Sequence, residues 1–276
     1  MSPLVTTEWL ATHLNEVRVV DASWYMPDDK REPGREFTIE HIPGAVFFDI
    51  DGIAEHSTDL PHMMPSPEAF ASAVSALGLA DGDTIVVYDG TGIFSAPRVW
   101  WALRVMGHDK VFVLDGGLPK WKREGRPVEG GAAAPTPAGF HARPVAALAR
   151  DYDAVLAHLK AEDAQILDAR SNSRFTGAEK EPRAGLKSGH MPGAVNVPWR
   201  SLIAPDNTLK DDHALRQLFA EKGVDMRAPI VTTCGSGISA AIIMLALTRL
   251  GAADVSLYDG SWAEWGGRDN APVATG

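Results

Sequence analysis

The sequence is poor in cysteine and in basic charge. Cys234 is the one cysteine among 276 residues, so an internal disulfide and a cysteine-based zinc cluster are both excluded. The 36 acidic residues outnumber the 26 basic ones and give a formal net charge of −10. This balance disfavours nucleic acid and anionic membrane surfaces as partners.

Long apolar runs are also missing. The longest, Ile238 to Leu247, falls far short of the roughly 20 residues that a membrane-spanning helix needs. The opening residues, MSPLVTTEWL, have neither the basic nor the apolar segment of a secretory signal. The overall share of hydrophobic residues, 45 %, is that of an ordinary globular protein. We therefore expect a folded protein of a reducing compartment, most simply the cytoplasm.

Four motifs occur twice, in the same order, which indicates two copies of one domain. In the two copies of these motifs, Asp21 corresponds to Asp168, His41 to His190, Asp89 to Cys234, and Asp115 to Asp259. Between the copies, the segment EGGAAAPTPAGF is rich in small residues, Gly and Pro, as an exposed linker is. The sequence predicts a first domain over 1–130, a linker over 131–144 and a second domain over 145–276.

Each copy alternates strand-like runs with helical segments. Short runs rich in β-branched residues predict strands over Ile85–Tyr88, Val111–Leu114, Gln165–Leu167, Ile230–Thr233 and Val255–Tyr258. Between them, helices are predicted over Pro67–Leu77, Ala96–Met106, Asp151–Leu159, Ala214–Lys222 and Ser239–Leu250. This alternation predicts an α/β fold of two tandem domains, each a parallel sheet flanked by helices on both faces.

Cys234 lies where such a sheet carries its chemistry, in the loop after the predicted strand Ile230–Thr233. Gly235 and Gly237 are expected to let the chain curl tightly before the next helix. A curled loop that leads into a helix directs several backbone N–H groups at one point, where they can hold a sulfur anion. A lone cysteine is more often an inert buried side chain. Its place at a strand end favours a reactive thiol instead.

Two kinds of thiol chemistry fit the loop poorly. A tyrosine-phosphatase-like loop needs an arginine six residues after the cysteine, but position 240 is alanine. A cysteine protease needs a histidine base close to the thiol, and a six-residue loop around the sulfur leaves little space for one. A ring of donors without a phosphate-binding arginine suits a second sulfur atom carried on the cysteine, as a persulfide.

The chain resembles the tandem rhodanese-like sulfurtransferases over nearly its whole length. The matching motifs are HIPGAVFFDID at 41–51, SAPRVWW at 95–101, LDGGLPKW at 114–121, EPR at 181–183, GHMPGAVNVPW at 189–199, CGSGIS at 234–239 and YDGSWAEW at 258–265. Gly235 and Ser236 stand where thiosulfate-type rhodaneses usually have basic residues, which is similar to the branch that uses 3-mercaptopyruvate. Ile238 and Ser239 replace the Val-Thr that is usual in the family, and both changes are conservative.

The resemblance implies an inactive first domain, a catalytic second domain and a persulfide on Cys234. It assigns Arg174 and Arg183 to the carboxylate of 3-mercaptopyruvate, which an arginine fork binds through two parallel hydrogen bonds. The loop N–H groups of Gly235, Ser236, Gly237, Ile238 and Ser239 are expected to hold the substrate sulfur. Solvated surface charge is the alternative for the two arginines.

The resemblance also implies a relay of Asp51, His62 and Ser236 that moves the donor's thiol proton. Tying down a long loop is the alternative role for Asp51 and His62. The expected sulfur acceptors are a small thiol, cyanide or a dithiol protein such as a thioredoxin-like protein, and no metal or organic cofactor is implied. Two other functions stay open, namely a thiosulfate sulfurtransferase and a non-catalytic sulfur-binding regulatory module.

His41 and His190 occur in both copies, each before a Pro-Gly-Ala turn. A residue that the inactive copy shares with the active one is expected to have a structural role.

Overall fold

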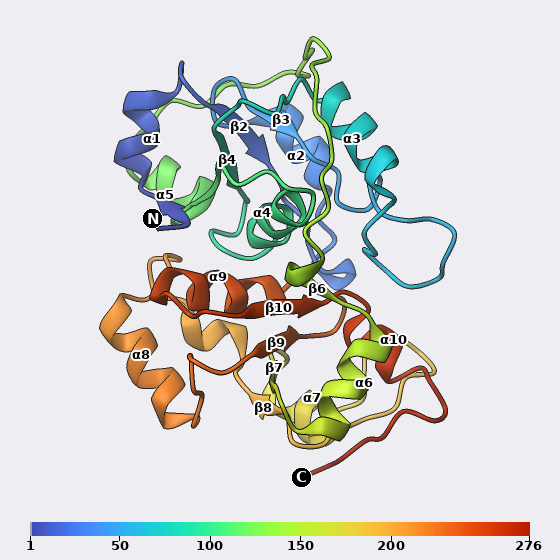
Figure 1. Cartoon of the computed structure of the whole chain (residues 1–276). Coiled ribbons are helices and arrows are strands. Elements are labelled where there is room, and N and C mark those ends of the chain that lie inside the picture. Colours follow the sequence, from blue (N-terminus) through green and yellow to red (C-terminus); the bar gives the residue numbers. More distant parts are fainter. Residues whose placement is uncertain (1) are drawn as a thin grey trace. The chain divides into compact units, whose positions relative to one another are not determined.

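The computed structural model describes residues 2–276, which form two compact units (Figure 1). The first unit comprises the described residues of Met1–His56, together with Met64–Val145 and Ala204–Leu209. The second comprises Ser57–Met63, Ala146–Ile203 and Lys210–Gly276. Each half of the chain therefore gives one short segment, 57–63 or 204–209, to the unit that the other half mainly builds.

The first unit contains a five-stranded parallel sheet in the order β1-β5-β4-β2-β3. Its strands are β1 (Leu4–Val5), β2 (Arg18–Asp21), β3 (Val46–Phe47), β4 (Ile85–Tyr88) and β5 (Val111–Leu114). Its helices are α1 (Thr7–His13), α2 (Pro33–Ile39), α3 (Pro67–Ala76), α4 (Ala96–Val105) and α5 (Gly117–Arg123), with a 3₁₀ turn at Pro27–Asp29. Every residue of β4 is buried, as expected of a central strand that is covered on both faces.

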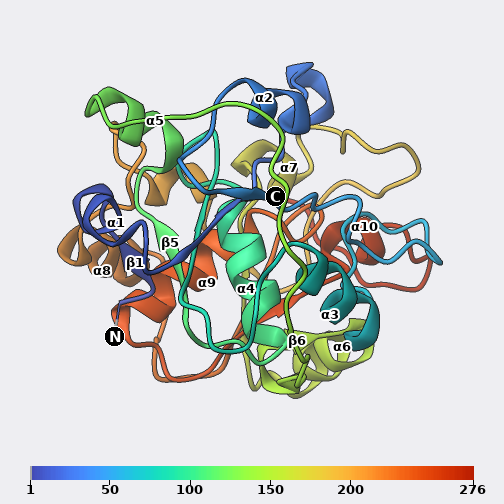
Figure 2. The same ribbon diagram turned by 90° about the horizontal axis from the view of Figure 1, so that it is seen from above.

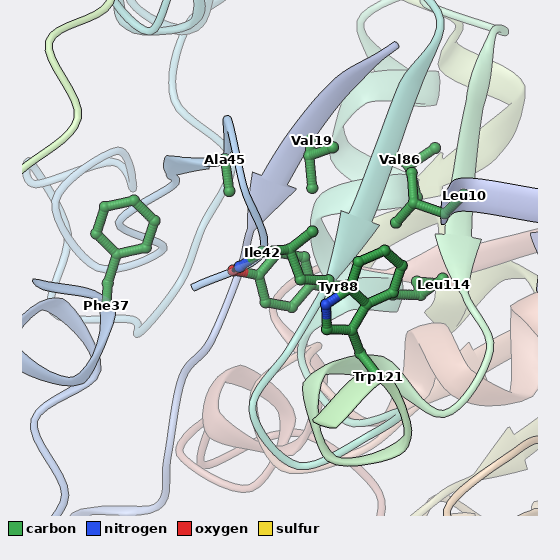
Figure 3. Close-up of a cluster of buried hydrophobic side chains, with 9 residues drawn as sticks. All are labelled: Leu10, Val19, Phe37, Ile42, Ala45, Val86, Tyr88, Leu114 and Trp121. Carbon is green, nitrogen blue, oxygen red and sulfur yellow. Dashed lines mark hydrogen bonds between the residues drawn. The ribbon is translucent and has the colours of Figure 1, made fainter. Parts of the chain in front are cut away.

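Helices α1, α2 and α5 share one core with this sheet (Figure 3). Leu10 of α1, Phe37 of α2 and Trp121 of α5 pack with Val86 and Tyr88 of β4, and all five are at most 5 % exposed. Figure 2, which views the chain from above, shows α1 and α5 close together, in agreement with their direct contact. Helix α4 contacts β4 and β5, and almost all of its residues are buried.

The second unit repeats this architecture in the order β6-β10-β9-β7-β8, again with all strands parallel. Its strands are β6 (Ala149–Arg150), β7 (Gln165–Asp168), β8 (Val195–Asn196), β9 (Ile230–Thr233) and β10 (Val255–Tyr258). Its helices are α6 (Tyr152–Ala161), α7 (Asn172–Thr176), α8 (Asp212–Glu221), α9 (Ala240–Leu250) and α10 (Ser261–Trp265), with 3₁₀ turns at Ala146–Leu148 and Trp199–Leu202.

Helices α6 and α10 share a core with the second sheet. Val155 of α6 and Trp262 and Trp265 of α10 pack with Ile166 of β7 and Val231 of β9. Helix α9 contacts β9 and β10 and is apolar on all sides as far as Leu247, which fits its nearly complete burial. The prediction of an α/β fold with parallel sheets flanked by helices is therefore confirmed.

The local signals agree with the observed bounds. Strands β4, β5, β9 and β10 have the predicted limits, and β7 extends one residue further, to Asp168. Helices α3, α6 and α8 begin after Ser66, Asp151 and Asp211, whose side chains accept a backbone N–H of the first turn. Among the described residues, no helix combines the length and the apolar character that crossing a membrane would require.

Candidate active site

Cys234 directly follows β9 and is 2 % exposed. Helix α10 holds its backbone on both sides: the Cys234 N–H donates to Ser261 Oγ at 3.3 Å, and its carbonyl accepts the Trp262 N–H at 2.9 Å. The next residue is anchored in the same way, because the Gly235 carbonyl accepts the Ala263 N–H at 2.9 Å. The thiol therefore lies at the carboxyl end of the central strand, on a backbone fixed by a second element.

The two loop glycines serve different purposes. Gly237 has φ +80°, a left-handed conformation that glycine adopts without strain. Gly235 does not have a positive φ, so a left-handed backbone is not the reason for glycine at this position. A Cβ on Gly235 would lie 3.0 Å from Nη2 of Arg174. A side chain at position 235 would therefore press against the guanidinium of Arg174.

This close approach places Arg174 beside the cysteine loop. Arg174 lies on the short helix α7, and its side chain is 18 % exposed. Its Nε donates to Glu181 Oε1 at 3.2 Å, and its Nη2 donates to Glu181 Oε2 at 2.5 Å. Arg183 is half-buried in the same loop, two residues after Glu181. Arg174 thus lies against the loop of Cys234. Arg183 lies in the same chain segment as Glu181, which accepts hydrogen bonds from Arg174.

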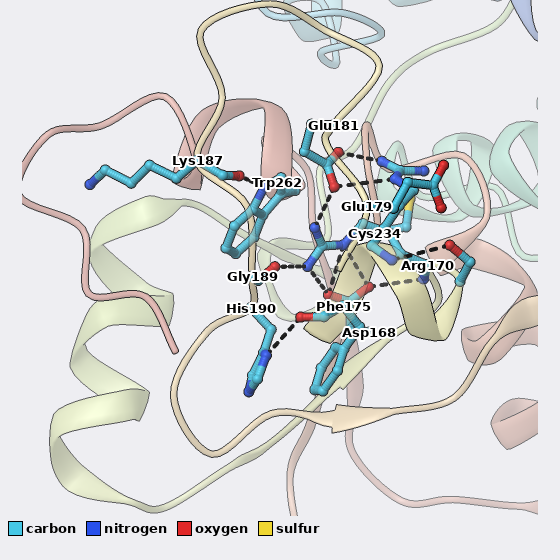
Figure 4. Close-up of polar contacts among 12 residues, drawn as sticks. Asp168, Arg170, Phe175, Glu179, Glu181, Lys187, Gly189, His190, Cys234 and Trp262 are labelled. Carbon is cyan, nitrogen blue, oxygen red and sulfur yellow. Dashed lines mark hydrogen bonds and ion pairs between the residues drawn. The ribbon is translucent and has the colours of Figure 1, made fainter. Parts of the chain in front are cut away.

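Two buried charged residues were not identified from the sequence, Arg170 and Glu181. Both side chains are 1 % exposed (Figure 4). Arg170 donates to both carboxylate oxygens of Asp168, to Glu181 Oε1 at 2.8 Å and to the Gly189 carbonyl at 2.8 Å. Burial disfavours its charge, but Asp168 and then Glu181 outweigh that penalty and raise the pKa of Arg170. A signal existed, because the first copy reads DAS where the second reads DAR.

His62 belongs to the segment 57–63 of the second unit and is 7 % exposed. Its Nδ1 lies 3.3 Å from the backbone carbonyl oxygen of Ser236, so this contact reaches the loop backbone rather than the hydroxyl. Asp51 belongs to the first unit, where its Oδ2 accepts the indole N–H of Trp24 at 2.9 Å. The relay of these three side chains stays a prediction.

The first unit shows what a loop of this kind can bind. Asp89 occupies the position of Cys234 and is fully buried. Its Oδ1 accepts the backbone N–H groups of Thr91 and Gly92, and its Oδ2 accepts those of Phe94, Ser95 and Ala96, all at 2.8–3.0 Å. The loop therefore forms a ring of five donors around its own carboxylate.

The two repeated histidines are held in the same way. His41 stacks on Phe37 at 4.1 Å, with Nδ1 2.7 Å from the Phe37 carbonyl oxygen. His190 stacks on Phe175 at 3.8 Å, with Nδ1 2.8 Å from the Phe175 carbonyl oxygen. A similar arrangement in a unit without the cysteine agrees with the structural role expected for both.

The comparisons with known proteins agree with this geometry. The model of the rhodanese-like domain matches residues 6–124 and 151–268. The 3-mercaptopyruvate sulfurtransferase of Escherichia coli K12 is 43 % identical over 98 % of this chain and 96 % of its own. The thiosulfate sulfurtransferase of Bos taurus is 42 % identical over 95 % of this chain and 91 % of its own.

Among solved structures, SseA from Escherichia coli, described as a 3-mercaptopyruvate sulfotransferase with the rhodanese fold, matches with a TM-score of 0.87 and 40 % identity. The match covers 95 % of this chain and 99 % of SseA. With a repeated parallel sheet, a cysteine at the end of the second central strand and a carboxylate in the matching position of the first, the chain belongs to the family of sulfurtransferase enzymes built from two rhodanese-like domains.

Proposed function

We propose that the protein transfers the sulfur of 3-mercaptopyruvate through a persulfide on Cys234. The proposal rests chiefly on the loop of Asp89, where five N–H groups surround a buried anion. By the repeat, the donors at 91, 92, 94 and 95 correspond to positions 236, 237, 239 and 240, whereas the Ala241 N–H, which corresponds to that of Ala96, donates to the Ile238 carbonyl at 3.3 Å. We assign these four donors at Cys234 to an anionic sulfur, because backbone dipoles fixed in advance stabilise charge without reorganising.

The reaction proceeds in two transfers. The Cys234 thiolate attacks the sulfur of 3-mercaptopyruvate, an S–S bond forms, and the donor's C–S bond breaks. The bonding electrons leave with pyruvate as its enolate, which then takes up a proton. An acceptor thiolate attacks the outer sulfur, takes it as a persulfide and returns Cys234 to the thiolate, so ping-pong kinetics are expected.

Arg174 and Arg183 bind the carboxylate of the donor in this proposal. Arg174 is the better supported of the two, because its guanidinium lies against Gly235 while 18 % of its side chain stays exposed. The carboxylate is bound in the ground state and in the transition state alike, so Arg174→Ala is expected mainly to raise KM. Losing such a charge-assisted pair costs about 2–3 kcal/mol, or roughly 30- to 150-fold.

The choice of donor follows from the residues after the cysteine. The relatives in Escherichia coli and Bos taurus are 43 % and 42 % identical to this chain but are named for different donors. Thiosulfate is a small dianion, and a cation directly beside the sulfur would favour it. Here residues 235 and 236 are Gly and Ser, and Arg174 approaches the loop from another segment. This position suits a longer donor with a carboxylate at its far end.

The proton step and the acceptor complete the proposal. His62 contacts the loop at the Ser236 carbonyl, and we assign to its imidazole the transfer of the donor's thiol proton. We place Asp51 and Ser236 in the same relay. A dithiol protein of the thioredoxin type, a small thiol or cyanide takes the sulfur. Because Cys234 must be reduced to react, we place the protein in a reducing compartment such as the cytoplasm.

The test compares the two donors directly. Pyruvate release from 3-mercaptopyruvate and sulfite release from thiosulfate are measured on one preparation with cyanide as the common acceptor. The proposal predicts a higher kcat/KM for 3-mercaptopyruvate. A higher kcat/KM for thiosulfate would overturn the donor assignment, and no turnover with either donor would favour a non-catalytic module.

A further inference from the structure

We propose that Glu181 is a positioning residue that sets the direction in which Arg174 presents its guanidinium to the donor. The inference rests on the proposed function, because it assumes that Arg174 binds the donor's carboxylate. It assigns a role to the first residue of the EPR motif, which the chemistry of the cysteine loop leaves unexplained.

Glu181 connects two arginines with different environments. Its Oε1 accepts Arg170 Nη1 at 2.8 Å and Arg174 Nε at 3.2 Å, and its Oε2 accepts Arg174 Nη2 at 2.5 Å. The Glu181 side chain is 1 % exposed, whereas that of Arg174 is 18 % exposed. The carboxylate is therefore a buried link between an enclosed guanidinium and one that reaches the surface of the site.

The link is rigid on the side of Arg170. That guanidinium is also bonded to Asp168 and to the Gly189 carbonyl, and it lies over the Trp262 ring at 4.1 Å (Figure 4). A rotation of the Arg170 guanidinium would break these hydrogen bonds. Arg170 therefore restrains the Glu181 carboxylate through Oε1, while Oε2 accepts Arg174.

The link also decides which donors of Arg174 stay available. A guanidinium carries five N–H groups. Glu181 uses the Nε–H and one Nη2–H, which form the side edge of the fork. The end edge, formed by Nη1–H and the second Nη2–H, is left to bind another carboxylate in the bidentate manner. Nη2 is also the atom nearest to Gly235, so this edge lies next to the loop of Cys234.

Charge and position predict opposite effects of removing the Glu181 charge. If Glu181 acted only through its charge, its loss would make the site more positive and would strengthen binding of an anionic donor. If Glu181 acts by holding Arg174, the guanidinium loses its preferred direction and binding becomes weaker. The sign of the change in KM therefore separates the two explanations.

The experiment measures kcat and KM for 3-mercaptopyruvate in Glu181→Gln, alone and combined with Arg174→Ala. Positioning predicts that KM rises about tenfold in Glu181→Gln, the size expected from loss of one charge-assisted hydrogen bond, while kcat changes little. In the Arg174→Ala background, Glu181→Gln should add no further rise. Glu179→Gln is the matched control, because it removes the same charge from an exposed side chain of the same loop and should leave KM unchanged.

Glu181→Asp keeps the charge and shortens the side chain by one methylene group, so it serves if the glutamine variant does not fold. It should raise KM less than Glu181→Gln, and again only when Arg174 is present. An unchanged or lower KM in the Glu181 variants, or an equal rise without Arg174, would overturn the positioning role. If Arg174→Ala itself leaves KM unchanged, the failure lies in the proposed function, because Arg174 would not bind the donor.

Discussion

Adding one methyl group at Gly235 tests whether the position of Arg174 governs donor binding. The new Cβ of Gly235→Ala would lie 3.0 Å from Arg174 Nη2, and ordinary contacts begin near 3.4 Å. The guanidinium must therefore move by about 0.4 Å. Its two hydrogen bonds to Glu181 oppose this movement. A misplacement of about 1 Å costs roughly 100-fold in activity, so a shift of this size corresponds to roughly fivefold to tenfold in KM.

The same substitution should leave stability almost unchanged. Gly235 does not have a positive φ, so alanine carries no left-handed strain there and should even gain about 0.4–1 kcal/mol from a less flexible unfolded chain. Gly237→Ala is the contrasting control, because its φ of +80° makes alanine strained and should lower the melting temperature.

Steady-state kinetics with 3-mercaptopyruvate and thermal unfolding give both readouts for Gly235→Ala. The combination with Arg174→Ala should show no additional effect on KM, because the clash then disappears. An unchanged KM in a fully folded Gly235→Ala variant would refute the reasoning. The guanidinium would then move at no cost, or it would play no part in binding.

Three further predictions concern buried carboxylates. Asp89→Ala leaves five N–H groups of its loop without this acceptor, three of them from buried hydrogen bonds, and should lower the free energy of unfolding by at least about 3 kcal/mol in urea denaturation. A loss below about 1 kcal/mol would contradict the ring of donors. Asp168→Asn should lower the free energy of unfolding by about 3–5 kcal/mol, because it leaves the buried Arg170 guanidinium poorly paired. Asp21→Asn should lower the free energy of unfolding far less at pH 7. Burial is the main cause that raises the pKa of Asp21, so the charge that asparagine removes is already disfavoured in the folded protein. Because the folded pKa lies above the unfolded value, Asp21 stabilises the fold most at low pH. The difference in unfolding free energy between wild type and Asp21→Asn should therefore shrink as pH rises from about 3 to about 7. A difference that grows over this range would contradict the buried environment of Asp21.

Much of the fold could be predicted because it depends on local and repeated signals. Ile230–Thr233 is a short run of β-branched residues that is buried on both faces, and such runs have few alternatives to a central strand. The first copy gives the same indication independently, because Ile85–Tyr88 is a similar buried run directly before Asp89. The position of Cys234 at the end of a strand followed from these two observations.

The polar network around Arg174 could not be predicted in the same way. Glu181 and Arg170 lie outside helix α7, which carries Arg174, so no helix period relates the three residues. Buried ion pairs depend on three-dimensional enclosure, which no local pattern encodes. The reason for Gly235 was missed on the same grounds, because the sequence does not show that an arginine from another segment covers it.

The central claim is that Cys234 carries the sulfur between donor and acceptor. Intact-mass analysis after treatment with 3-mercaptopyruvate, with no acceptor present, tests it most directly. One added sulfur atom, about 32 Da, is expected on wild type, and none is expected on Cys234→Ser, which replaces the nucleophile and leaves the backbone bonds of residue 234 to Ser261 and Trp262 in place. The same mass increase on Cys234→Ser, or its absence from wild-type protein that releases pyruvate, would contradict the account.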